Sequence, residues 1–88
     1  MPDEPILREQ AREAMRTGRL PARPADRTSG GPGVGALCSV CNLTVRNSVM
    51  EMQIEFAREG EPGGVDTYHV HVRCFTAWEF ERGNAQSL

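Results

Sequence analysis

The cysteines and histidines of this chain form one pattern, Cys38-x-x-Cys41 followed by His69-x-His71-x-x-Cys74. Thiolate sulfur and imidazole nitrogen suit zinc best, and zinc usually takes four such ligands in a tetrahedron. A spacing of two residues lets a tight turn direct both members of a pair at one ion. The pattern therefore predicts one Zn²⁺ per chain, bound by Cys38, Cys41, His71 and Cys74.

The choice of histidine is left open by this pattern. His69 and His71 are two residues apart on an expected strand, so both imidazoles project from the same side of it. His71 is favoured because its spacing to Cys74 repeats that of the first pair, and His69 is the alternative fourth ligand. Three thiolates and one imidazole leave no coordination position for substrate or water, and a closed zinc site of this kind is structural. We therefore expect the chain not to be an enzyme.

Other chemistry for these thiols fits the pattern less well. A redox dithiol at Cys38 and Cys41 usually lies in a strand-to-helix context within a larger α/β fold, whereas glycines precede this pair. Nucleophilic catalysis by Cys74 would need a third orienting group and a substrate cleft, which are hard to place in so small a domain. An iron–sulfur cluster usually requires four cysteines, and the chain has three.

Two segments of alternating apolar and polar residues must position the histidines. Residues 50–56 and residues 67–72 both alternate with period two, which is typical of half-buried strands. The stretch between them, residues 58–64, contains glycine and proline and predicts a turn. The two segments should therefore form an antiparallel hairpin, with one more short strand expected at Leu43 and Val45.

A helix is expected directly after this hairpin, over residues 73–82. Its first turn would contain Cys74, where free backbone N–H groups and the helix dipole stabilise a thiolate. Gly83 is expected to end it, which leaves residues 84–88 as a disordered tail. Its helical spacing brings Cys74, Ala77, Trp78 and Glu81 close together.

The N-terminal part of the chain has a different character. Residues 1–18 are predicted to contain a helix over residues 5–17, with Asp3 or Glu4 as its cap and Gly18 just past its end. Residues 19–35 are rich in proline and glycine and are predicted to form a flexible linker. The zinc-binding domain is then expected over residues 36–83.

The size of this domain explains why a metal would be needed. A core of roughly 50 residues is marginally stable by itself, and small domains of this size usually depend on a metal, disulfides or a partner. The expected fold class is a small α+β domain stapled by the metal. It comprises a zinc knuckle, an antiparallel hairpin and a C-terminal helix, preceded by an N-terminal helix and a flexible linker.

This order of elements resembles a treble-clef zinc finger over about residues 36–83. The string His71-x-x-Cys74-Phe75 is loosely similar to the first zinc site of LIM domains, although the chain has no cysteines for a second site. The chain also resembles small uncharacterised bacterial proteins that carry Gly-Gly-Pro-Gly before Cys-x-x-Cys and end in Tyr-His-x-His-x-x-Cys-Phe. The resemblance implies a fold and a metal, and it implies no activity.

Charge and composition bear on the partners. The net charge is −2, and residues 36–88 hold four arginines against seven acidic residues, so nucleic-acid binding is not expected of the zinc domain. The start of the chain is acidic and no apolar run is long enough to span a membrane, so a cytoplasmic location is expected. A monomer is also expected. The predicted function is a non-enzymatic zinc module that binds another protein. The alternatives are a nucleic-acid-binding finger that uses the N-terminal arginines and a thiol-based redox or metal sensor.

Overall fold

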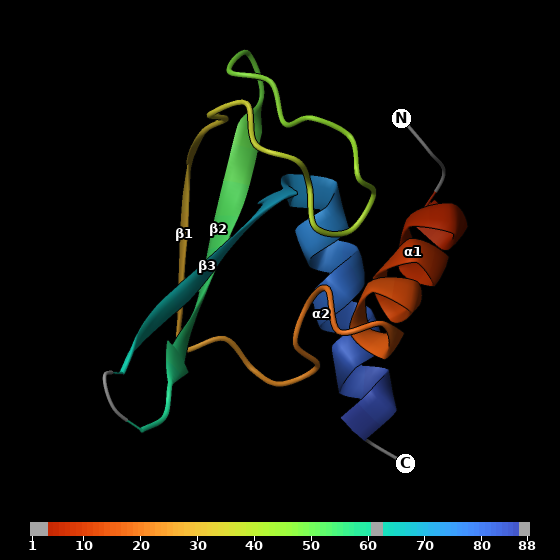
Figure 1. The fold of residues 1–88 in the computed structure, drawn as a ribbon. Coiled ribbons are helices and arrows are strands. Elements are labelled where there is room, and N and C mark those ends of the chain that lie inside the picture. The colour runs from red at the N-terminus through yellow and green to blue at the C-terminus, as the bar shows by residue number, and fades with distance from the viewer. Residues whose placement is uncertain (1–3, 61–62, 87–88) are drawn as a thin grey trace.

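The computed structural model describes residues 4–60 and 63–86, and it contains two helices and one three-stranded antiparallel sheet. The strand order in the sheet is β1-β2-β3. The helix α2 lies against the sheet and α1 lies on the other side of α2 (Figure 1). The elements in chain order are α1 (Glu4–Arg16), β1 (Arg27–Pro32), β2 (Met50–Arg58), β3 (Gly64–His71) and α2 (Val72–Gln86).

The predicted hairpin is present as β2 and β3. Ile54 lies opposite Tyr68 and Met52 lies opposite Val70, so these side chains share the face of the sheet that packs toward α2. Ile54 and Val70 are buried there, together with Phe56 from β2. The period-two pattern therefore identified both strands and the face that they bury.

The predicted flexible linker is wrong over residues 27–32, which form the strand β1. This strand pairs antiparallel with β2, and Gly31 lies opposite Glu51. Side chains contribute little to the pairing, because the strand consists of Arg-Thr-Ser-Gly-Gly-Pro. It is held instead at its ends, where the Asp26 carboxylate accepts a 2.7 Å hydrogen bond from the Ala57 N–H and Gly33 N–H donates to the Val49 carbonyl at 2.9 Å.

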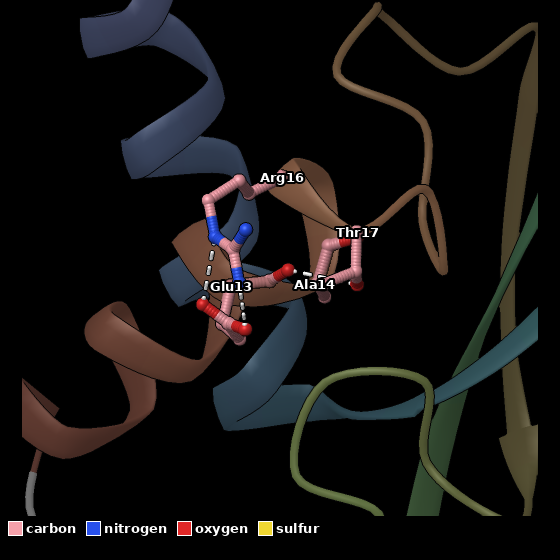
Figure 2. Close-up of polar contacts among 4 residues, drawn as sticks. All are labelled: Glu13, Ala14, Arg16 and Thr17. Atoms are coloured by element: carbon pink, nitrogen blue, oxygen red, sulfur yellow. Dashed lines mark hydrogen bonds and ion pairs between the residues drawn. The ribbon is translucent and has the colours of Figure 1, made fainter.

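The N-terminal helix α1 agrees with its prediction to within one residue at each end. It buries Leu7, Ala11 and Ala14, and Gly18 follows it with φ +81°, the left-handed conformation that glycine adopts most readily. Asp3, one of the two expected caps, lies outside the described residues. Figure 2 shows the last turn of this helix.

Two side chains stabilise that last turn. The Arg16 guanidinium donates to the carboxylate of Glu13 with both Nε and Nη2, which makes an exposed ion pair between residues three apart on the helix. The Thr17 hydroxyl lies 2.9 Å from the Glu13 carbonyl and 3.4 Å from that of Ala14. Both carbonyls also accept backbone hydrogen bonds, that of Glu13 from the Thr17 N–H and that of Ala14 from the Leu20 N–H.

The C-terminal helix α2 is longer than predicted. It runs to Gln86 through Gly83, so residues 84–86 of the expected tail are helical, while residues 87 and 88 lie outside the described part. A glycine inside a helix costs about 1 kcal/mol relative to alanine and does not by itself end the helix. The four residues expected to lie close together, Cys74, Ala77, Trp78 and Glu81, are all buried on this helix.

One hydrophobic core joins the N-terminal segment to the sheet and α2. The Phe56 ring lies edge-on to Trp78, with centroids 6.2 Å apart. The Trp78 indole N–H donates to the Pro21 carbonyl at 2.9 Å, and the neighbouring Leu20 is fully buried. The domain boundaries at residues 18 and 35 stay a prediction, but residues on both sides of them contribute to this core.

Two ion pairs to the buried carboxylate of Glu81 on α2 also join the two helices. Arg8 Nε and Arg12 Nη1 lie 2.9 and 2.8 Å from the two carboxylate oxygens of Glu81. These contacts hold the pKa of Glu81 below its ordinary value, against the burial that would raise it. Arg8 and Arg12 therefore hold α1 against α2.

Candidate metal centre

The first two cysteines lie in a tight knuckle between β1 and β2. The Cys38 N–H donates to the Leu43 carbonyl and the Asn42 N–H donates to the Cys38 carbonyl, each at 2.9 Å. Asn42 has φ 64°, a conformation that asparagine tolerates better than most residues. The expected strand at Leu43 and Val45 is reduced here to a single bridge.

Glycine at position 33 lets the chain enter this knuckle. A Cβ placed on Gly33 would lie 2.1 Å from the Arg46 carbonyl oxygen, so any other residue would have to displace the backbone. Two backbone hydrogen bonds join the segments on either side of the knuckle. Gly35 N–H donates to the Val45 carbonyl, and Val45 N–H donates to the Ala36 carbonyl. The close approach of the two chain segments thus determines where the cysteines lie.

The other two residues of the pattern come from the junction of β3 and α2. His71 is the last residue of β3, and Cys74 lies in the first turn of α2. The strand and the knuckle are joined directly, because the Ser39 N–H donates to the His69 carbonyl at 3.0 Å. The hairpin and the knuckle therefore bring together residues that are about 30 positions apart in sequence.

The four predicted ligands form one compact cluster. The ligand atoms of Cys38, Cys41, His71 and Cys74 all lie within 4.8 Å of one another, so they are close enough to hold a metal ion. His71 Nδ1 is 3.4 Å from Cys41 Sγ and 3.9 Å from Cys74 Sγ. A tetrahedral zinc with ordinary bond lengths would place sulfur and nitrogen about 3.6 Å apart. The chemistry and the spacing of the donors both fit such an ion.

The electrostatics of the cluster show why it suits a cation. A hydrogen bond from Cys74, together with backbone N–H groups, lowers the pKa of Cys38 to about 4 despite its burial. The same Cys38 sulfur raises the pKa of Cys74, which donates to it, and burial raises that of Cys41. Without a metal the cluster therefore favours a single thiolate. A divalent cation would supply the charge that lets the other two thiols ionise.

The second histidine is turned to a different partner. His69 Nδ1 lies 2.8 Å from Glu51 Oε2, and the amide of Gln53 donates to the same oxygen at 2.9 Å. His69 is not part of the described cluster. The structure thus brings His71, and not His69, to the cysteines.

Glu51 is the residue that the sequence analysis missed. It was expected on the exposed face of its strand, yet its side chain is 0% exposed. Hydrogen bonds from His69, Gln53 and the Val34 N–H lower its pKa against the effect of burial, while its Oε1 has no hydrogen-bond partner among the described residues. The alternating pattern alone contains no signal for this burial. The burial depends on the loop after β1, from which the Val34 N–H reaches the carboxylate.

The surface beside the cluster is apolar with isolated arginines. Leu43, Thr44, Arg46, Val49 and His71 line an open groove of about 400 Å³. Leu37 and Val34 are also exposed near the knuckle. Arg73 is exposed at the start of α2 and is in no ion pair within the described part of the chain.

Comparisons of the chain with protein-family models, with curated proteins and with solved structures gave no match. Within the described residues, neither helix has the length and apolar character that crossing a bilayer requires. The fold and the site together define a small α+β domain that carries a Cys₃His cluster suited to a metal ion.

Proposed function

We propose that this chain is a non-enzymatic module built around one structural Zn²⁺ and that it binds another protein. The observation that carries the metal assignment is the mutual approach of four thiol and imidazole donors to within 4.8 Å. The thiolates of Cys38, Cys41 and Cys74 and Nδ1 of His71 hold the ion. Because all four positions are then taken by the protein, the ion stabilises the fold and offers no position to a substrate.

The proposal includes a treble-clef arrangement for this domain. Its support is the order of elements: a knuckle with two cysteines, the hairpin β2–β3, and α2, whose first turn contains Cys74. The N-terminal helix α1 and the strand β1 are additions to that arrangement. They extend the core of the module beyond the knuckle, hairpin and helix.

The choice between the histidines can be tested with two matched variants. We expect His71→Gln to lower the zinc content of purified protein from about one per chain to well below half, because three ligands hold zinc weakly. His69→Gln should retain about one zinc, since glutamine still offers a hydrogen-bond donor to Glu51. Elemental analysis after gel filtration gives both values. Loss of zinc from the His69 variant alone would reverse the assignment.

The protein-binding role is proposed on the exposed apolar side chains near the metal cluster. Val34, Leu37, Leu43 and Val49 are 44–64% exposed, and exposed apolar patches often mark interaction sites. Phe80 on α2 is also 49% exposed, but the Arg8 guanidinium lies 4.1 Å from its ring centroid. We therefore place the contact surface at the knuckle and not at α2.

The alternative functions find less support in the contacts of the relevant side chains. Four N-terminal arginines, Arg8, Arg12, Arg16 and Arg23, are in ion pairs with carboxylates, which reduces the charge that they could offer to phosphate. A thiol sensor needs cysteines that an oxidant can reach, and all three cysteines are buried. These observations favour the structural role for the cluster.

An affinity capture with metal-loaded protein tests the contact surface. We expect Leu43→Asp to abolish capture of a partner that the unaltered protein retains, because a carboxylate would be desolvated at the centre of the surface. Val65→Asp serves as the matched control, since Val65 is equally exposed but lies on β3, within the hairpin. Equal capture by both variants would place the contact surface elsewhere.

A further inference from the structure

The strand β1 forms one edge of the sheet, and its outer side is open. Among the described helices and strands, β1 packs only on β2. Figure 1 shows no other element beyond it. Five of its six residues are exposed, and only Gly31 is partly covered.

The register shows which backbone groups this edge offers. Gly33 N–H donates to the Val49 carbonyl, which continues the register in which Gly31 lies opposite Glu51. In an antiparallel pair, alternate residues direct both backbone groups to the same neighbour. Residues 27, 29 and 31 therefore face β2, while the N–H and carbonyl groups of Thr28 and Gly30 face outward.

The two glycines of this strand have no explanation inside one copy of the chain. Neither is among the residues with positive φ. A Cβ on Gly31 would meet nothing within 4 Å, and one on Gly30 would make ordinary contact with Met52 Sδ at 3.5 Å. Glycine inside a strand costs about 0.5–1 kcal/mol relative to alanine, and it often marks the close approach of another backbone.

We propose that the outer edge of β1 pairs with the same edge of a second copy of this chain. The pairing is antiparallel about a twofold axis at Ser29 and joins two three-stranded sheets into one. Thr28 of each copy lies opposite Gly30 of the partner subunit, and each such pair exchanges both backbone hydrogen bonds. The inference adds a contact surface beyond the one proposed at the knuckle, and it replaces the monomer expected from the sequence.

The side chains of β1 are compatible with this arrangement and favour it over a foreign strand. Arg27, the one charged residue of the strand, lies opposite Gly31 of the partner subunit, so the two arginines do not face each other. Recognition of a foreign strand takes its specificity from pockets for alternate side chains. Glycine, serine and threonine build no walls for such pockets. The twofold pairing requires none.

The contact area of a single strand pair is small, so the dimer belongs to the weak class of interfaces. Sedimentation of zinc-loaded protein from about 10 µM to about 1 mM covers the range in which such interfaces dissociate. We expect the mean mass to rise from the 9.7 kDa of one chain toward twice that value. Thr28→Pro removes one outward N–H, which an edge strand tolerates, and should weaken dimerisation at least about tenfold. Thr28→Ala keeps the N–H and should dimerise normally.

Amide exchange on the unaltered protein gives an independent readout. Exchange at Thr28 and Gly30 should slow as the concentration rises, whereas exchange at Val65 and Thr67 on the other edge of the sheet should not change. A monomer at all concentrations, a dimer that tolerates Thr28→Pro, or protection at β3 instead would overturn the inference. Zinc content and circular dichroism of the same samples separate this outcome from failure of the proposed metal site, because a folded, zinc-loaded monomer would contradict only the dimer.

Discussion

Chelation of the proposed zinc ion is expected to unfold this protein. Structural zinc contributes about 10–16 kcal/mol of apparent binding free energy in finger peptides, which is comparable with or larger than the about 5–15 kcal/mol of an entire small domain. One core joins α1, the sheet and α2. We therefore expect a strong chelator to abolish the ellipticity of the helices and the sheet together, and added Zn²⁺ to restore it.

A single ligand substitution should have the same effect. Cys74→Ser replaces one of the four proposed zinc ligands, a buried sulfur at the start of α2, with a hydroxyl that binds zinc poorly. The variant should therefore be unfolded at any modest zinc concentration. Thr76→Ser is the control, because Thr76 is exposed on the same helix. A metal-free protein that melts cooperatively would show that the cluster is not a structural metal site.

Truncation of Phe56 is expected to produce the largest loss of stability outside the metal cluster. Its ring is 2% exposed and makes edge contacts with Tyr68 and Trp78, so it joins both strands of the hairpin to α2. Phe56→Ala leaves a cavity that the surrounding backbone can fill only in part, and such truncations cost about 3–5 kcal/mol. Chemical denaturation at saturating zinc measures this loss.

Phe80→Ala provides the matched control for that measurement. Phe80 is half-exposed and its ring is covered by Arg8, so its removal should cost no more than about 1 kcal/mol. Similar losses for the two variants would mean that Phe56 does not occupy the centre of the core. The difference between the variants is the informative quantity, since both remove the same atoms.

The elements that depend on local pattern could be predicted from the sequence. The alternation over residues 50–56 and 67–72 identified β2 and β3 because one face of each strand is buried and the other is polar. The spacing of Cys74, Ala77, Trp78 and Glu81 identified the inner face of α2. The burial of Glu81 was not predicted, because it depends on the docking of α1 and its two arginines.

The strand β1 could not be predicted because its side chains carry no signal. Its pairing depends on the free edge of β2 and on end contacts such as that from Asp26 to Ala57, and neither is a property of residues 27–32 themselves. Composition there correctly indicates a segment with little to bury. It does not distinguish a flexible linker from a strand held by backbone hydrogen bonds.

In the candidate site, too, the features set by local spacing could be predicted and those set by tertiary contacts could not. The spacing of Cys38, Cys41, His71 and Cys74 was enough to group them, because a metal site with two close pairs needs only a turn and a strand–helix junction. The burial of Glu51 depends on the loop that follows β1, and the separation of His69 from the cluster follows from its contact with that carboxylate. Because the sequence analysis did not predict β1, it gave no reason to expect the burial of Glu51 or the separation of His69 from the cluster.

The position of Trp78 makes its intrinsic fluorescence a probe of the folded state of this protein. It is the only tryptophan in the chain, and its indole N–H is bonded to the Pro21 carbonyl while its ring lies in the core one helical turn after Cys74. Release of the segment after α1 would expose the indole to water and shift its emission to longer wavelength. Intrinsic fluorescence can therefore follow the docking of the N-terminal segment and the state of the metal cluster in one sample, without a label.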